Sequence, residues 1–491
     1  MAVDNSKLEK IVGKKNVLAD EATLMQFSQD QSFVAPRRPD AVVYVETVEQ
    51  VQQLVKLANE TLTPIVPFSS GLTLRGAAIA DQGGIILNMS RMKKIIEIDD
   101  ENLFAMVEPG VTYKQLQDEL TPKGLKVMIP FGAPADRSVL TSYLERDPVM
   151  AAPCFEDGNS LIMDTEIVLP NGDIFHTGNW ASGGRPGAPS GPIRTNILRM
   201  WTGAQGTLGI MTKMVVQVSY MPAQRKIFFI PFKSLAEAVE PMKRIQRREI
   251  GSESFIINSF NLAALLTESW KVPSKFPVKA ADAKEFEQIR KVLPAYTMAV
   301  VINGPKRRTE EKIAYEVTAL KELCDSLNVQ LLESLPNITG AENIIDAEIL
   351  RPWGVLRKFN YKGSVHDLTF KAPITKIAEL EKLMFDLALQ AGYPAADIGM
   401  YLMPLERGRA IHCEFDLHCT AADEAERETV KTLWQKASAE LINNGAYFDR
   451  PYGIWAPLMY SRAAVYSQML QKLKAETDPN NILNPGKLCF A

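Results

Sequence analysis

The stretch that decides the fold is Pro64-Ile-Val-Pro-Phe-Ser-Ser-Gly-Leu-Thr-Leu-Arg-Gly-Ala-Ala78. It starts as a buried strand at Ile65 and Val66, and it continues into a loop of small and hydroxyl-bearing residues with one cation, Arg75. Glycine permits positive φ angles and leaves the backbone uncovered, so such a loop brings backbone N–H groups close to an anion. Two interpretations stay open at this point: a loop that holds a cofactor pyrophosphate, and an ordinary tight turn.

Length and composition indicate an ordinary globular protein. The chain has 491 residues, of which 46% are apolar and 23% charged, and its net charge is −3. This length suggests roughly two or three domains. The charge gives no positive field for nucleic acid or for an anionic membrane surface. No apolar run approaches the roughly 18 residues of a membrane span, and the polar N-terminus lacks the core of a signal peptide, so we expect a cytoplasmic protein.

The first 220 residues mix predicted strands with a few helices. The expected strands are 41–45, 84–89, 95–99, 103–108, 160–169, 173–176 and 210–218, and the expected helices begin at Val48 and Tyr113. Both helices follow a capping box, Thr47 with Gln50 and Thr112 with Gln115. Residues 129–160 are rich in proline and glycine and show little periodicity. The pattern predicts an α+β domain.

A second pattern of predicted strands and helices begins after Met221-Pro222. Four strands are each followed by a helix: the strands are 227–231, 297–302, 368–371 and 411–417, and the helices begin at Ser234, Thr309, Thr375 and about Ala422. Four such units in one stretch predict a second α+β domain, with helices on one side of a mainly antiparallel sheet.

Several common catalytic signatures are absent from the sequence. There is no G-x-G-x-x-G after a strand, no G-x-x-x-x-G-K-[ST], no H-E-x-x-H and no G-x-S-x-G. The five cysteines are scattered without a Cys-x-x-Cys, so the sequence indicates neither a disulfide framework nor a zinc or iron–sulfur site. His412 and His418 lie on one face of a predicted strand, where packed or solvated histidines are more common than a metal site. We therefore expect no metal.

Five short motifs occur in the order and at the spacing of one enzyme family. They are the Pro64–Ala78 loop, Val107-Glu108-Pro109-Gly110-Val111-Thr112-Tyr113, Leu144-Glu145-Arg146 followed by Asp157 and Glu166–Gly172, Gly203-x-x-Gly206-Thr207-Leu208-Gly209, and Asp478-Pro479 with Asn484-Pro485-Gly486-Lys487. On these residues the chain resembles the vanillyl-alcohol oxidase / p-cresol methylhydroxylase family of FAD-dependent oxidoreductases, over most of its length.

The resemblance implies a flavoprotein of two α+β domains. Residues 1–220 would form an FAD-binding domain of the p-cresol methylhydroxylase type, 221–443 an α+β cap with an antiparallel sheet covered by helices, and 444–491 a segment that returns to the FAD domain. The residues it implies for FAD binding are Pro67, Phe68, Ser69, Ser70, Gly71, Leu72, Thr73, Gly76, Pro109, Gly110, Gly203, Gly206, Thr207, Gly209, Ile210 and Asn484.

The resemblance also assigns groups near the flavin and the substrate. Asp157 aligns with an aspartate beside flavin N5, where it would tune hydride transfer or accept a proton. Family members that oxidise phenols clamp the phenolate with two tyrosines and an arginine, and here Leu74 and Asp449-Arg450 stand at those positions. Arg75 and Arg450 would suit a carboxylate instead. The catalytic residues we predict are Asp157, Arg450, Tyr447 and Asp449, and the substrate-binding residues are Arg75, Tyr452 and His412.

The functional prediction is an FAD-dependent dehydrogenase or oxidase that passes a hydride from a small alcohol or hydroxy acid to flavin N5. Two alternatives stay open: a 4-alkylphenol or aryl-alcohol oxidiser, and a flavin-binding electron-transfer subunit of a larger complex. His366 is displaced by about two residues from the family's covalent flavin histidine, so we expect non-covalent FAD. The acceptor would be oxygen, a cytochrome, an electron-transfer flavoprotein or a quinone, and a homodimer or higher oligomer is expected. We expect no nucleic acid partner.

Overall fold

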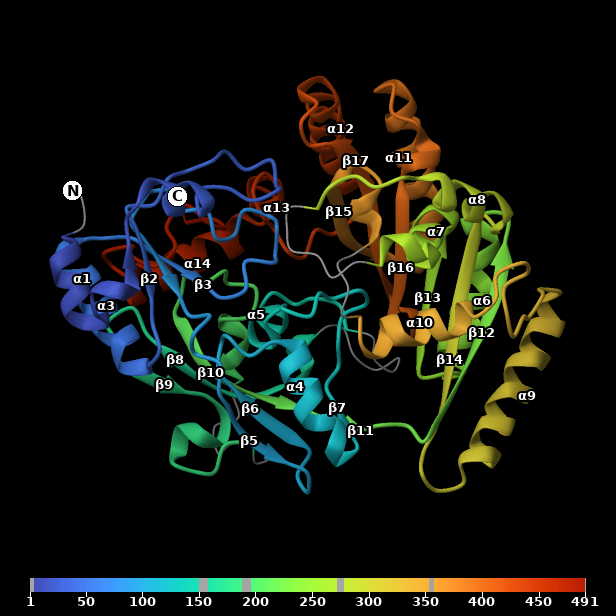
Figure 1. Ribbon diagram of the computed structural model, residues 1–491, viewed down its shortest axis with the longest axis horizontal. Coiled ribbons are helices and arrows are strands. Elements are labelled where there is room, and N and C mark those ends of the chain that lie inside the picture. The colour runs from blue at the N-terminus through green and yellow to red at the C-terminus, as the bar shows by residue number, and fades with distance from the viewer. Residues whose placement is uncertain (1–3, 150–157, 188–195, 272–277, 353–356, 491) are drawn as a thin grey trace.

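The computed structural model describes residues 4–149, 158–187, 196–271, 278–352 and 357–490. It contains two sheet-bearing parts that lie side by side, one built from the N-terminal and C-terminal segments and one from the middle of the chain (Figure 1). Within the described ranges, no helix is long and apolar enough to cross a membrane.

The first sheet holds the Pro64–Ala78 loop. Its strand order is β1-β2-β4-β3, and β2, β4 and β3 run parallel to one another. The loop follows β3 directly, so it lies at the carboxyl end of parallel strands, where ligands of such sheets commonly bind. The bounds are α1 Asn5–Val12, β1 Val17–Leu18, α2 Glu21–Gln26, β2 Ala41–Tyr44, α3 Val48–Thr61, β3 Ile65–Phe68 and β4 Ile85–Asn88.

The second sheet is antiparallel, with the order β5-β6-β10-β8-β9. Its elements are β5 Ile95–Asp99, β6 Phe104–Val107, α4 Tyr113–Leu120, β7 Leu125–Lys126, α5 Val139–Leu144, β8 Ile162–Val168, β9 Ile174–His176, β10 Ile210–Gln217 and β11 Ser219–Tyr220, which pairs with β7. Helix α5 lies in the segment that shows little periodicity, and Ser138 caps its start by accepting a hydrogen bond from the Thr141 N–H at 3.1 Å. One capped turn is enough to begin a short helix.

The middle of the chain forms a six-stranded antiparallel sheet with the order β12-β14-β13-β16-β17-β15. Its elements are β12 Gln224–Phe232, α6 Leu235–Arg247, β13 Glu253–Asn258, α7 Ser259–Leu266, α8 Lys284–Val292, β14 Tyr296–Gly304, α9 Thr309–Leu327, α10 Ala341–Leu350, β15 Gly363–Pro373, α11 Ile377–Gln390, β16 Gly399–Leu405, β17 Ala410–Thr420 and α12 Glu424–Asn443. This architecture confirms the α+β fold class.

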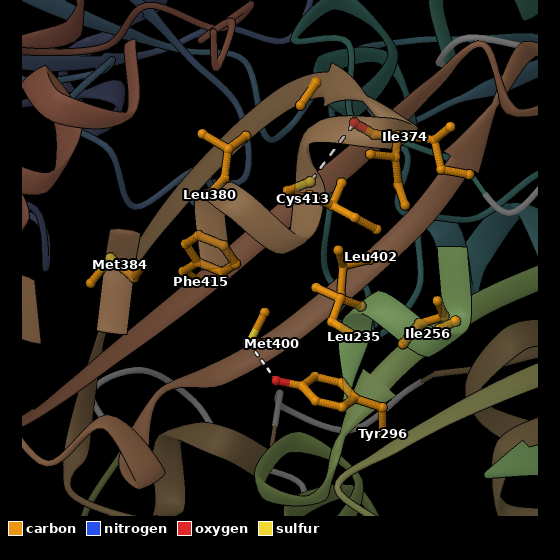
Figure 2. Packing of buried hydrophobic residues seen from close by; sticks show 14 of the residues in the cluster. Leu235, Ile256, Tyr296, Ile374, Leu380, Met384, Met400, Leu402, Cys413 and Phe415 are labelled. Atoms are coloured by element: carbon orange, nitrogen blue, oxygen red, sulfur yellow. Dashed lines mark hydrogen bonds between the residues drawn. The ribbon is translucent and has the colours of Figure 1, made fainter. Parts of the chain in front are cut away.

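Helices cover both faces of this sheet, although the sequence predicted one. Helices α6, α9, α11 and α12 pack on the face where Leu235, Ile256, Leu402 and Phe415 point toward one another (Figure 2). Helices α7 and α10 pack on the opposite face at the β12–β13 end, because apolar residues there occupy both faces of the strands. Alternation along β15 and β17 leaves a polar stripe on that same opposite face, which turns toward the first part of the molecule and carries Asp367, Lys371, His412, Glu414 and Asp416.

The C-terminal segment returns to the first sheet. Its helices are α13 Trp455–Tyr460 and α14 Ala464–Thr477. Beyond them Leu483 pairs with Ile65: the Ile65 N–H donates to Ile482 O at 2.7 Å, and the Asn484 N–H donates to Ile65 O at 2.8 Å. The start of the Pro64–Ala78 loop is therefore held by the end of the chain.

Lys474 anchors α14 from a buried position. Its Nζ donates to Thr207 O at 2.7 Å and to Leu483 O at 2.9 Å, and it pairs with the buried carboxylate of Asp478. Replacing Lys474 with methionine leaves that carboxylate without its cation, which costs about 3–5 kcal/mol for a buried pair. We expect Lys474→Met to lower the urea midpoint and the Tm, while Lys472→Met, at an exposed site on the same helix, changes neither. Equal midpoints would contradict this role.

Candidate active site

A groove of about 100 Å³ lies along the Pro64–Ala78 loop. One wall is the loop itself, another is α5, and the third is the segment from Trp201 to Met211. Eight of the residues predicted to bind the cofactor line it together: Pro67, Phe68, Ser69, Gly71, Thr73, Gly206, Gly209 and Ile210. Segments that lie more than a hundred residues apart in the sequence thus meet at one concave site.

The backbone of the groove requires glycine at two positions. Gly71 and Gly206 have φ angles of +66° and +71°. A Cβ at Gly71 would lie 2.5 Å from the Phe68 ring, and one at Gly206 would lie 2.7 Å from Pro67 Cγ. The bare backbone at these two turns, together with the hydroxyls of Ser69 and Thr141, suits a phosphate-bearing ligand.

The other predicted cofactor residues brace the groove from behind or lie beside it. Pro109 O accepts from Ser138 Oγ at 2.6 Å, Gly203 N–H donates to Leu144 O at 2.7 Å, and Asn484 Nδ2 donates to Gln205 O at 2.7 Å. Ser70, Gly76, Gly110 and Thr207 also take part in hydrogen bonds with neighbouring segments, and Leu72 lines the adjoining cavity.

An inner cavity of about 210 Å³ adjoins the groove, and Thr73 lines both. It lies between the two parts of the molecule, with the loop residues Leu74 and Arg75 on one side and the polar stripe of β15 and β17 on the other. Phe131 and Tyr401 face each other across the two parts, with their rings stacked at 5.2 Å. The cavity is therefore lined partly by apolar side chains and partly by charged groups.

Three guanidiniums gather around one carboxylate in this cavity. Asp147 accepts from Arg137 and from Arg450 at 2.6 Å each, and from Ser142 Oγ at 2.8 Å. Arg75 pairs with Asp367. Burial works to raise the pKa of Asp147, but Arg137, Arg450 and Arg75 together lower it below its ordinary value. All three cations thus lie close to Asp147.

Glu145 and His412 are two further titratable groups near this cluster. Glu145 accepts from Thr73 Oγ1 at 2.9 Å and lies 3.3 Å from Arg137, yet burial raises its pKa above the ordinary value. His412 lines the inner cavity, and burial, followed by the positive charge of Arg450, lowers its pKa to about 4. Its imidazole is therefore neutral at pH 7 and free to accept a proton.

The predicted catalytic and substrate residues divide into four groups. Arg75, Arg450 and His412 line the inner cavity. Tyr452 is buried beneath Arg75, with the guanidinium carbon 5.9 Å from the ring centre, and lines a neighbouring cavity of about 260 Å³. Asp449 and Tyr447 lie outside the inner cavity. Asp449 is paired with Lys371 at 2.9 Å, and Tyr447 is 55% exposed. Asp157 lies outside the described residues.

Sequence reasoning missed Arg137 and Asp147. Both lie in the proline- and glycine-rich stretch, where no periodicity shows which side chains are buried. The available signal was indirect: Asp147 directly follows the Leu144-Glu145-Arg146 motif, and a charged residue next to a family motif is a candidate for the same site.

Comparison with known proteins decides the family. Residues 39–178 match the model of the FAD binding domain, and residues 455–488 match that of the C-terminal domain of FAD linked oxidases. The flavoprotein subunit of 4-cresol dehydrogenase (hydroxylating) from Pseudomonas putida is 33% identical in an alignment that covers 98% of this chain and 94% of that protein.

The chain belongs to the p-cresol methylhydroxylase-type family of FAD-dependent oxidoreductases. A structure of p-cresol methylhydroxylase with substrate bound has the same fold, with a TM-score of 0.83 at 22% identity over 99% of this chain and 96% of that one. A probable mitochondrial D-lactate dehydrogenase from Danio rerio is 30% identical over 242 residues, so the match spans about half of each chain: 49% of this one and 47% of the relative.

Membership of the p-cresol methylhydroxylase-type family makes FAD the cofactor and an oxidoreductase the class of enzyme. The groove fits this cofactor because its glycine turns and hydroxyls leave room for a diphosphate beside the sheet. Within the described part of the chain, no group of three or more His, Cys, Asp or Glu side chains could hold a metal.

Gly71 offers a direct test of the groove. An alanine at Gly71 carries the strain of a positive φ and also collides with Phe68, so the loop must move. We expect Gly71→Ala to weaken FAD binding by about tenfold or more, which corresponds to about 1.4 kcal/mol. Gly183→Ala is the matched control, because its φ of +79° carries the same strain with no atom within 4 Å. FAD titration of the apoprotein gives both Kd values, and equal values would remove Gly71 from the site.

Proposed function

We propose that this enzyme oxidises a hydroxy acid, that is, an alcohol that carries a carboxylate. The observation that carries the proposal is the cluster of Arg75, Arg137 and Arg450 at the inner cavity. Within the described residues, the buried Nε of Arg75 has no hydrogen-bond partner, so a donor is left over for a ligand. Arginine is the side chain best suited to bind a carboxylate through forked hydrogen bonds.

The charges of the cavity favour an anion. Arginine stays protonated at every physiological pH. Burial, by contrast, raises the pKa of Glu145 and of Glu348, which pair with two arginines that line the cavity, Arg137 and Arg357. Each proton that such a carboxyl takes up leaves the cavity with more positive charge. A bound carboxylate would neutralise that charge, and the apolar body of the substrate would pack against the cavity side of the Phe131–Tyr401 pair.

His412 is our candidate for the group that takes the hydroxyl proton. It is neutral at pH 7, it lines the same cavity as the arginines, and Arg450 is one cause of its low pKa. A substrate carboxylate beside Arg450 would cancel part of that effect, so His412 becomes a stronger base once the substrate is bound. FAD, when bound, supplies the chemistry that accepts the hydride.

FAD would be held without a covalent bond. His366, the histidine nearest the family's attachment position, is 5% exposed; its Nε2 lies 2.9 Å from Ser364 Oγ, and its ring stacks on Phe33 at 4.0 Å. It lines the 260 Å³ cavity and not the groove. The residues that would hold FAD are the predicted ones that line the groove: Pro67, Phe68, Ser69, Gly71, Thr73, Gly206, Gly209 and Ile210.

A second candidate function is oxidation of a 4-alkylphenol. The 33% identity to the 4-cresol dehydrogenase subunit favours it. Against it, Leu74 lines the cavity where a phenolate clamp would need a tyrosine, and Tyr447 is more than half exposed. The same relative is a flavoprotein subunit, which also supports transfer of electrons to a partner protein.

Anaerobic titration of the FAD-loaded enzyme distinguishes these functions. We expect mandelate or lactate to bleach the oxidised flavin spectrum, while mandelamide, which has the same hydroxyl but no carboxylate, reacts far more slowly. If 4-methylphenol alone bleaches the flavin, the substrate is a phenol and not a hydroxy acid. A flavin that no small molecule reduces, but that a partner protein reduces, would make the chain an electron-transfer subunit.

A further inference from the structure

Asp147 joins two arginines that lie far apart in the sequence, Arg137 and Arg450. Its Oδ1 accepts from Arg450, which lies 303 residues away in the C-terminal segment, and its Oδ2 accepts from Arg137 at the start of α5. Ser142 Oγ donates to the same Oδ2. Asp147 is 9% exposed and lines the inner cavity. Both oxygens of its carboxylate therefore accept hydrogen bonds at a position next to the cavity.

We propose that Asp147 is a positioning residue that fixes Arg137 and Arg450 and thereby selects substrates with one carboxylate over those with two. This inference rests on the proposed function, because it assigns a role within the same carboxylate site. Neither Asp147 nor Arg137 belongs to the motifs that indicated the family.

The physical reason lies in the balance of charges. Two desolvated guanidiniums repel each other, and a carboxylate that takes one on each oxygen holds both in a fixed orientation. Arg75 is already paired with Asp367, and Arg137 also lies 3.3 Å from Glu145, so with Asp147 in place the cluster has positive charge for no more than about one further anion. A second carboxylate on the substrate would meet Asp147 itself. Removing the charge of Asp147 therefore removes the repulsion that a dianion would meet. The alanine variant also removes the volume of the side chain.

The experiment compares phenylacetate and phenylsuccinate, which carry one and two carboxylates and have no hydroxyl to oxidise. Their Kd values are measured on FAD-loaded wild type and Asp147→Asn from the perturbation of the flavin spectrum. We expect the preference for phenylacetate over phenylsuccinate to fall by about tenfold or more in Asp147→Asn. The control is Asp164→Asn, which alters another buried carboxylate that lies outside all the cavities described above and should leave the preference unchanged.

Chemical rescue separates positioning from folding. In Asp147→Ala, added formate or acetate is expected to occupy the vacated place and to restore kcat toward wild type with mandelate, with little change in FAD content. The inference is overturned if Asp147→Asn keeps the wild-type preference, or if folded, FAD-containing Asp147→Ala does not respond to either anion. Failure of the proposed function has a different signature, because wild type itself would then bind neither phenylacetate nor mandelate.

Discussion

Replacing Arg450 with methionine is expected to lower kcat/KM for mandelate by about 30- to 5,000-fold. The loss has two sources: the substrate carboxylate loses a charge-assisted donor, and Asp147 loses one of the two cations that neutralise it. Truncating one partner of a buried, hydrogen-bonded charge pair costs about 2–5 kcal/mol, which gives a factor of this size. Stopped-flow reduction of the flavin measures the effect directly.

Two controls show whether the loss comes from carboxylate binding. With mandelamide as substrate, Arg450→Met should change kcat/KM much less, since there is no carboxylate to anchor. Arg450→Lys keeps the charge but not the planar fork, so we expect it to recover only part of the rate. If Arg450→Met loses acid and amide oxidation equally while it keeps its FAD, then Arg450 acts on the fold of the site and not on the substrate.

Replacing His412 with glutamine is expected to lower the rate of flavin reduction by about 10²–10⁴-fold, the usual contribution of a positioned general base. Glutamine keeps a hydrogen-bonding side chain of similar length on β17, so KM should change little. FAD content and Tm serve as checks that the buried strand is intact. A rise in KM without a fall in the rate of flavin reduction would assign His412 to substrate recognition.

The pH dependence offers an independent test of His412. Because its pKa is about 4, the neutral form predominates above roughly pH 5, and protonation removes it as the pH falls through 4. Wild type should therefore reduce its flavin at a constant rate near neutral pH and lose activity in acid. Substrate binding neutralises Arg450 and raises this pKa, so the acid limb should shift upward in the enzyme–substrate complex. In His412→Gln that limb should be absent.

Local patterns in the sequence were sufficient for much of the fold. Apolar spacing and the capping box predict a helix that begins at Val48, and the structure begins α3 there. The helix predicted to begin at Tyr113 is α4, which starts at that residue. In these cases short-range hydrogen bonds and one buried face decide the structure, and both can be read from neighbouring residues.

Other features depend on contacts that no local pattern encodes. Strands β13 and β16 were not predicted, and α7 and α10 cover a face that was expected to lack helices, because burial on both faces is only visible once the sheet exists. The Arg137–Asp147–Arg450 network joins residues up to 303 positions apart. Tyr447 lies three residues before Arg450 in the sequence. Its backbone nevertheless pairs with Lys371 of β15, and the tyrosine is 55% exposed.

The pairing of Ile65 with Leu483 also bears on how the protein matures. About 400 residues separate the two partners, so the ribosome needs roughly 20–80 s to make the stretch between them, at 5–20 residues per second. Throughout that time the nascent loop lacks the strand partner that fixes its entry point. Loading with FAD should therefore follow synthesis of the segment around Leu483, because the edge of β3 lacks that partner until then.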